Sequence, residues 1–296
     1  MKFYHSLFVF FFMGISGTSF LSGATLPPSV VFVGKDRFNT LVDQAKRKNI
    51  PTLPLGDRTV RLGLALVGTP YENFTLELDD RIEAPSVNMR GMDCWTLFEI
   101  ALGTARAFSL SPRPTSTDLL KMIELDRYRG GKCTGRFDSR LHHLEDWIRD
   151  NKRRGLVEDI TPKLPGATHV KRNMEYMGTK WKNFRQLKAD RSLIPFFQKL
   201  ERDLSRRGIY YVPKNRVKSI EKYLQNGDVI CIVTNWHGTY TSHVGLAVKQ
   251  PNGRVRFLHA SRDERKVILD DTITDYLYRY DKHAGIMVAR PKDIRR

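Results

Sequence analysis

The sequence predicts an α+β fold, with helices up to residue 226 and an antiparallel sheet after it. Before that point, several segments carry apolar residues at spacings of three and four, the period of a helix buried along one face. From Asp228 the chain changes to short segments rich in Val and Ile, which are typical of strands. The pair Asn252-Gly253 between two of these segments is a strong hairpin signal. Helices followed by hairpin-linked strands indicate α+β architecture.

Residues 1–24 are interpreted as a secretory signal peptide. They carry the basic residue Lys2 directly after Met1, continue with an apolar run from Leu7 to Met13 and end in Ser-Gly-Ala. Glycine and serine interrupt the run, which makes a poor membrane span; an uncleaved anchor is the alternative. We therefore expect an exported protein, periplasmic or secreted, with one mature domain over residues 25–296. That domain opens with a polar, proline-containing lead-in over residues 25–55.

Two helices are expected before the middle of the chain. The first ends at Gly68-Thr69-Pro70, and its apolar residues are Val60, Leu64 and Val67. An extended stretch then leads to a longer helix that begins at Cys94, because Asp93 is a good N-cap and an apolar stripe starts directly after it. The stripe consists of Cys94, Leu97, Phe98, Ala101, Leu102 and Ala105.

The middle of the chain, about residues 107–226, is expected to be mainly helical. The segments with helical periodicity and capping residues are "STDLLKMIELDRYRGG", "SRLHHLEDWIRDN" and "RSLIPFFQKLERDLSRRG". The strand segments that follow are "DVICIVTNW", "SHVGLAVKQ", "RVRFLHAS", "KVILDD" and "GIMVARP".

The composition combines a globular hydrophobic content with a strong excess of positive charge. Lys and Arg number 50 against 32 Asp and Glu, a formal net charge of +18. Such an excess favours anionic partners, although scattered basic residues are also typical of a solvated surface. The sequence has no glycine-rich phosphate loop, zinc-type cysteine spacing or aromatic-basic RNA motif. We therefore expect no nucleic-acid partner, no metal and no cofactor.

The three cysteines differ in their settings. Cys231 alternates with valines in a strand-like run, as a small core residue would, and Cys133 lies in a glycine-rich loop. Whether these two pair in an oxidising compartment stays open. Cys94 would open a helix, where the dipole and free amides lower the pKa of a thiol and can stabilise an oxyanion. It is the candidate nucleophile, with a packed core residue as the alternative.

A cysteine nucleophile needs a base, and His243 and His259 lie on strands joined by the Asn252-Gly253 turn. A two-residue loop would place the histidines on opposite faces of the hairpin. A three-residue loop that includes Pro251 pairs Gly245 with His259 and places both histidines on one face, diagonally adjacent. Proline fits a loop better than a paired strand, which favours the second register. Either histidine could still be a structural residue.

Several motifs together resemble a known family. They are "GTPYENFTLE", "GMDCWTLFE", "FDSRLHHLEDWIRDN", "SHVGLAV" and "LHASRDERKVILDD". In this order they resemble the NlpC-type branch of papain-like cysteine hydrolases and, within it, a bacterial N-acetylmuramoyl-L-alanine amidase-like family. The resemblance covers the chain from about Val60 to the C-terminus. It implies a papain-like fold, in which the nucleophile helix packs on an antiparallel sheet or barrel and a mainly helical insertion separates the Cys and His blocks.

The resemblance also implies roles for individual residues. Cys94 becomes the nucleophile, His243 the general base and acid, and His259 the group that orients it. Tyr71 would lie near the developing oxyanion. Trp95 stands where NlpC-type enzymes usually carry a small residue, which narrows the cleft beside the nucleophile.

Other residues are candidates for substrate contact. Asp93 and Ser242 adjoin the nucleophile and the base in sequence, and Asn235-Trp236-His237 precede the base strand. Arg140 and His142 could bind a carboxyl group of the substrate. The alternative is a helix start at which Asp138 or Ser139 is the cap and Arg140 pairs with a nearby acid.

The expected function is that of an exported cysteine amidase acting on peptidoglycan or its fragments through a thioester. The bond would be the N-acetylmuramoyl–L-alanine amide, with a D-glutamyl–diamino acid bond of the stem peptide as an alternative. Acyl transfer is a second alternative. A non-catalytic wall-binding module is the third, and the sequence does not give the oligomeric state.

Overall fold

The computed structural model describes residues 26–294, so the signal peptide expected over residues 1–24 lies outside the described residues. The helices are α1 (Pro28–Val31), α2 (Lys35–Arg47), α3 (Leu55–Leu64), α4 (Cys94–Leu110), α5 (Ser116–Arg127), α6 (Leu144–Arg153), α7 (Arg185–Ala189), α8 (Ile194–Arg207), α9 (Lys214–Ile220) and α10 (Ile273–Tyr278). The strands are β1 (Phe32–Val33), β2 (Val87–Asn88), β3 (Val157–Asp159), β4 (Thr168–Val170), β5 (Ile209–Pro213), β6 (Val229–Thr234), β7 (Thr241–Lys249), β8 (Val255–Ser261), β9 (Lys266–Thr272) and β10 (His283–Pro291).

The main sheet has eight antiparallel strands, seven of them in the order β4-β5-β10-β6-β7-β8-β9, with β3 paired to β10. The five strand segments predicted after residue 227 are all present, and β6 to β9 form a meander. The α+β prediction is therefore confirmed. The middle of the chain differs from the prediction, because β3, β4 and β5 come from the segment expected to be helical. Part of that segment belongs to the central sheet.

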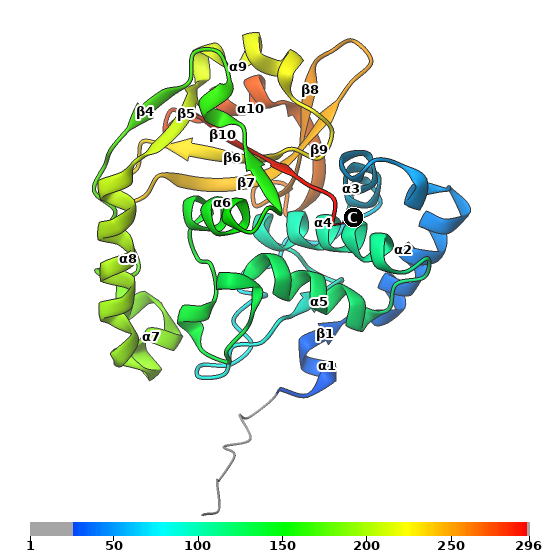
Figure 1. Cartoon of the computed structure of the whole chain (residues 1–296), viewed down its shortest axis with the longest axis horizontal. Coiled ribbons are helices and arrows are strands. Elements are labelled where there is room, and N and C mark those ends of the chain that lie inside the picture. Colours follow the sequence, from blue (N-terminus) through cyan, green and yellow to red (C-terminus); the bar gives the residue numbers. More distant parts are fainter. Residues whose placement is uncertain (1–25, 295–296) are drawn as a thin grey trace, which may run out of the picture.

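Each face of the sheet has its own hydrophobic core. In β6, Cys231 and its alternate neighbours face one core, while Ile230 and Ile232 face the other, so the strand is buried throughout. Figure 1 shows α9 and α10 on one side of the sheet and α4, α5 and α6 on the other. A strand covered on both faces has no polar alternation, which explains why "VICIVT" reads as a continuous apolar run.

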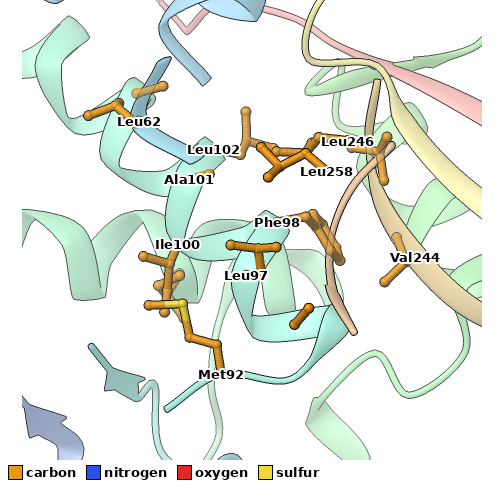
Figure 2. Packing of buried hydrophobic residues seen from close by; sticks show 14 of the residues in the cluster. Leu62, Met92, Leu97, Phe98, Ile100, Ala101, Leu102, Val244, Leu246 and Leu258 are labelled. Carbon is orange, nitrogen blue, oxygen red and sulfur yellow. The ribbon is translucent and has the colours of Figure 1, made fainter. Parts of the chain in front are cut away.

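Helix α4 packs directly on the strand that carries His243. Leu97 and Phe98 are completely buried, and Figure 2 shows this side of α4 facing Val244 and Leu246 of β7 and Leu258 of β8. Full burial of each such side chain stabilises the fold by about 1.5–3 kcal/mol. The contact fixes the start of α4 relative to β7, and with it the position of Cys94 relative to His243.

The N-terminal region contains a helix that the sequence reasoning missed. Residues 25–55 were expected to be a polar lead-in, but α2 occupies much of that stretch. Its buried residues, at spacings of three and four, are Phe38, Leu41, Val42 and Ala45. The predicted helix before Gly68 is present as α3, although it ends at Leu64 and Val67 is 46% exposed.

The hairpin between β7 and β8 has the register expected for the three-residue loop. Gln250 donates its backbone N–H to Arg254 at 2.8 Å, and Leu246 lies opposite Leu258. The same register places Gly245 opposite His259. A Cβ added to Gly245 would lie 2.9 Å from the His259 Cβ and closer still to the Leu258 carbonyl, so only glycine fits there.

Within residues 26–294, no helix is both long enough and apolar enough to cross a membrane.

Candidate active site

Cys94 is the first residue of α4, and Asp93 caps the helix as predicted. The Asp93 carboxylate accepts the Thr96 N–H at 2.8 Å, while the Thr96 hydroxyl accepts the Asp93 N–H at 2.9 Å. This reciprocal pair is a capping box, and it satisfies amides at the helix start. Because Asp93 Oδ1 accepts from both the Thr96 amide and the Thr96 hydroxyl, Asp93 acts as a helix cap.

The Cys94 thiol is neutral in the free protein, contrary to the expectation from the helix dipole. Burial and the nearby Asp93 carboxylate raise the pKa of Cys94 to about 12. The backbone amides of Val244, Cys94 and Trp95 act in the opposite direction but do not outweigh these effects. The sulfur therefore needs a base to remove its proton during attack.

The two histidines of the hairpin share one face and are hydrogen-bonded. His243 Nε2 lies 2.8 Å from His259 Nδ1, which leaves His243 Nδ1 as its second ring nitrogen. His243 lines the same two cavities as Cys94. Burial, together with His259 and His283, lowers the pKa of His243 well below its ordinary value of 6.5, so the ring is neutral at neutral pH. A neutral imidazole can accept a proton.

Asp270 of β9 extends the chain of hydrogen bonds, and the sequence reasoning did not single it out. Its Oδ2 lies 3.1 Å from His259 Nε2, and Arg279 binds both carboxylate oxygens at 2.8 and 2.9 Å. Burial alone would raise the pKa of Asp270, but the hydrogen bonds from His259 and Arg279 lower it below its ordinary value. The pairing of β8 with β9 points to Asp270, because His259 lies opposite Ile268 and Asp270 is on the same face of β9 as Ile268.

An ionised Asp270 fixes the tautomers of both histidines. A carboxylate only accepts, so His259 donates from Nε2, and in this tautomer of the neutral ring Nδ1 is unprotonated. That nitrogen can only accept, so His243 donates from Nε2 and its Nδ1 is bare. The free lone pair of His243 is therefore available to take the Cys94 proton.

Aromatic rings hold the two histidines in place. Tyr276 of α10 stacks on His243 with ring centroids 5.9 Å apart and lies 5.0 Å from the His259 ring. Phe257 stacks on His259 at 4.7 Å. Sequence reasoning missed Tyr276, which approaches the site from outside the matched motifs.

Tyr71 reaches the site because its segment joins the edge of the sheet. The Tyr71 N–H donates to the Arg265 carbonyl at 2.9 Å, and Pro70 bridges to Lys266 of β9. Burial and the neighbouring Cys94 raise the pKa of Tyr71 to about 12, so its hydroxyl stays protonated and can donate a hydrogen bond. Tyr71 lines the larger cavity beside Cys94, as a residue near the oxyanion would.

Trp95 is fixed by a buried network. Its indole Nε1 donates to Glu99 at 2.7 Å, and Glu99 forms a buried ion pair with Arg127 at 2.8 Å. Arg127 also donates a hydrogen bond to the carbonyl of Ser86 at 3.0 Å. The tryptophan predicted to narrow the cleft lines the smaller cavity beside Cys94 in a single orientation.

The structure separates the two candidates in the "SRLHHLEDW" segment. Arg140 is buried and pairs with Glu77 at 3.1 Å and Glu83 at 3.6 Å, as the structural alternative anticipated. The predicted cap is wrong, because α6 begins only at Leu144, after His143. His142 lines the smaller cavity and contacts the Phe137 carbonyl at 2.7 Å.

Two cavities meet at the nucleophile. One, of about 580 Å³, extends from Tyr71 past Trp236 to Lys282, and the other, of about 170 Å³, extends toward His142. The residues that line both are Cys94, Ser242 and His243. Trp236 is 55% exposed at the rim of the larger cavity, which fits a substrate contact and excludes a core residue.

The remaining cysteines are not cross-linked. Cys94, Cys133 and Cys231 are all free thiols, and Cys231 is buried in the core as predicted. Over residues 26–294, no cluster of His, Cys, Asp and Glu side chains has the arrangement of a metal site.

The sequence matches a family model over residues 61–286, described as N-acetylmuramoyl-L-alanine amidase-like (AmiA-like). This chain belongs to that family. The predicted resemblance is thereby confirmed, and membership indicates a hydrolase related to peptidoglycan amidases. A comparison with curated proteins finds no match.

Solved structures share the fold of this family member. An N-acetylmuramoyl-L-alanine amidase from Bacteroides uniformis is 28% identical with a TM-score of 0.73, covering 81% of this chain and 99% of its own. A putative xylanase from Bacteroides fragilis is 33% identical with a TM-score of 0.71, covering 78% and 99%. A Legionella pneumophila protein of the DUF1460 family, 23% identical with a TM-score of 0.63, covers 87% and 96% and shows the fold alone.

Proposed function

We propose that this protein is a cysteine amidase with a papain-like, NlpC-type fold that hydrolyses the N-acetylmuramoyl–L-alanine bond of peptidoglycan. The observation that carries the proposal is the directed chain of hydrogen bonds from Asp270 through His259 to His243. It leaves a bare nitrogen on a neutral imidazole that shares both cavities with Cys94. Family membership and the Bacteroides uniformis amidase support the choice of bond.

The reaction starts from a neutral thiol and a neutral imidazole. As the Cys94 sulfur attacks the amide carbon, His243 Nδ1 takes the thiol proton, and the carbonyl oxygen becomes an oxyanion. The backbone amides at the start of α4 and the Tyr71 hydroxyl are the donors available to it. The C–N bond then breaks, and His243 gives its proton to the leaving amine.

Water completes the cycle. His243 Nδ1, again unprotonated, takes a proton from water as the oxygen attacks the thioester carbon. The C–S bond breaks, the sulfur regains a proton, and a carboxylic acid is released. His259 holds its tautomer throughout, because Asp270 is bound on both oxygens by Arg279 and remains ionised.

The same machinery would cut an amide within the stem peptide, so the bond must be identified by its products. The name of the Bacteroides fragilis structure points to glycoside hydrolysis, which needs two carboxyl groups facing each other across the bond. In this chain the residues common to both cavities are Cys94, Ser242 and His243, which favours amide chemistry.

The proposal includes export. Residues 1–24 would act as a cleaved signal, and the mature single domain would work in the periplasm or outside the cell. There the large excess of Lys and Arg over Asp and Glu would favour anionic wall polymer through long-range attraction. The segment between α4 and β6, a mainly helical insertion, would shape access to the nucleophile.

The test is digestion of purified peptidoglycan and soluble muropeptides by the mature protein and by Cys94→Ala, with products identified by mass spectrometry. Stem peptides that begin with L-alanine, together with peptide-free glycan, are expected only from the wild type. Fragments cut inside the stem would assign an endopeptidase instead. Binding without any product from the wild type would assign a wall-binding module, and product bearing an added acceptor amine would assign acyl transfer.

A further inference from the structure

The two cavities that meet at Cys94 have opposite chemical character. The larger one is lined by cationic side chains, Arg262, Arg279 and Lys282, together with exposed acids. The smaller one is lined by no Lys, Arg, Asp or Glu, and its hydrogen-bonding side chains include Thr239, Thr241 and Ser242. A substrate held with its scissile amide at Cys94 therefore has one half in a charged cavity and the other half in an uncharged polar one.

The smaller cavity carries hydrogen-bonding capacity that the described part of the protein does not use. The Ser242 Oγ and the His143 Nε2 are both buried atoms without a hydrogen-bond partner among residues 26–294. Only 7% of the His143 surface is exposed. The Glu201 carboxylate lies 3.6 Å from its Nε2. Leaving such buried groups unpaired is unfavourable, and a bound ligand can supply the missing hydrogen bonds.

The walls of this cavity are rigid and partly aromatic. Trp95 is held by Glu99, while Tyr176 belongs to a loop whose backbone amides are bound by Glu201 at 2.6–3.1 Å. Tyr176 is 44% exposed and lines the cavity, while the Lys180 Nζ lies over its ring, 5.3 Å from the centroid. Flat aromatic faces beside neutral hydrogen-bonding groups suit a ring that carries hydroxyl and amide substituents.

We infer that the smaller cavity is the glycan subsite, which binds the N-acetylated sugar of the substrate, and that Arg262 in the larger cavity binds the stem peptide. This inference rests on the proposed function. In a muramoyl peptide, the sugar half is uncharged once its lactyl carboxyl group is in the amide, whereas the peptide half carries free carboxylates. Arg262 forms no ion pair within residues 26–294 and lies close enough to Tyr71 to affect its hydroxyl. Such a guanidinium is suited to bind both oxygens of a carboxylate, in a bidentate arrangement.

The first test compares two substrates that differ only in the sugar, N-acetylmuramoyl-L-alanyl-D-glutamate and N-lactoyl-L-alanyl-D-glutamate. For His143→Asn, which changes the smaller cavity and not the larger one, the ratio of kcat/KM between the first and the second should fall by about tenfold, the effect of a lost hydrogen bond. For Arg262→Gln, both substrates should lose about tenfold and the ratio should stay that of the wild type. An unchanged ratio in His143→Asn would overturn the assignment.

The second test does not need turnover. Cys94→Ala is titrated with the methyl amide of N-acetylmuramic acid, in which the lactyl carboxyl group is uncharged as it is in the substrate, and binding is followed by NMR. His143→Asn in this background should weaken binding by about tenfold, because His143 lines the smaller cavity and not the larger one, and Arg262→Gln should weaken it less. Loss of binding with Arg262→Gln alone would place the sugar in the other cavity and overturn the inference. If digestion instead yields fragments cut within the stem, the proposed function fails, while this titration still decides where the sugar binds.

Discussion

Two histidine–carboxylate pairs flank Cys94, and they do different work. In the sheet, His259 Nε2 contacts Asp270 at 3.1 Å. Its other ring nitrogen, Nδ1, lies 2.8 Å from His243 Nε2. In the insertion, His143 lies 3.6 Å from Glu201, beyond hydrogen-bonding distance, and Glu201 instead binds three backbone amides. The first carboxylate fixes a tautomer, whereas the second fixes a loop.

The difference teaches that a carboxylate beside a histidine does not by itself mark a catalytic site. What decides is where the remaining lone pairs and protons of both groups go. Asp270 is bound by Arg279 on both oxygens, so it stays ionised and imposes a direction on the hydrogen bonds that end at His243. No such chain connects Glu201 to the nucleophile.

The largest effect is expected from removing the central histidine of the sheet pair. His259→Ala should lower kcat by about 1000-fold, because His243 loses the partner that orients it and fixes its tautomer. The matched change in the other pair, His143→Ala, should lower kcat/KM by no more than about tenfold. The measurement is steady-state kinetics on a muramoyl peptide. Equal losses of kcat/KM in His259→Ala and His143→Ala would contradict the distinction between the two pairs.

Replacing each carboxylate by its amide sharpens the comparison. Asp270→Asn should lower kcat by about 100-fold with little change in KM, because an amide can donate to His259 and reverse the tautomers. Glu201→Gln should leave kcat close to the wild-type value. Kinetics of both variants, with circular dichroism as a check on folding, provides the comparison, and a larger kcat loss in Glu201→Gln would refute it.

Stability should show the reverse order. Glu201→Gln replaces a charged acceptor of three amides, so the free energy of unfolding should fall by about 2 kcal/mol. The change should appear as a lower midpoint in urea unfolding at unchanged m-value. Asp270 is nearer the surface of the site, and Asp270→Asn should cost less. A larger loss for Asp270→Asn would contradict the assigned roles.

A smaller effect concerns pH, because burial holds several histidines neutral. The pKa values of His142 and His243 lie well below 6.5, and that of His283 is about 4. Below about pH 6.5 the unfolded chain therefore binds protons that the folded chain does not, and stability falls as the pH is lowered. Each such proton contributes about 1.4 kcal/mol per pH unit. The dependence of the free energy of unfolding on pH is measured between pH 6 and pH 5 from urea unfolding. In His243→Gln its slope should be smaller by the amount that corresponds to about one proton. An unchanged slope would contradict a neutral His243.

The hairpin and the nucleophile helix were predictable because local rules determine them. Asp93 and the apolar stripe set the start of α4, and Pro251 set the loop that places His243 and His259 on one face. These features depend on a few consecutive residues, so the pattern in one sequence is enough. The same holds for the five strands after residue 227.

Other parts of the site depend on contacts between distant segments. Asp270 and Arg279 complete the relay from a strand and a loop whose own patterns show only exposed charge. The raised pKa of Cys94 arises from burial, which the helix-dipole argument does not include. Arg140 looked like a ligand for carboxyl groups, but Glu77 and Glu83, more than fifty residues upstream, already pair with it.

The measurement that tests the account most directly is the ¹⁵N NMR spectrum of the histidine side chains at pH 7 in the free protein. The account predicts that His243 is neutral with a bare Nδ1, and that His243 and His259 both carry a proton on Nε2. In Asp270→Asn this pattern should be lost, and in Glu201→Gln it should persist. A proton on Nδ1 of His243 in the wild type would contradict the account, because that nitrogen could not then take the proton of Cys94.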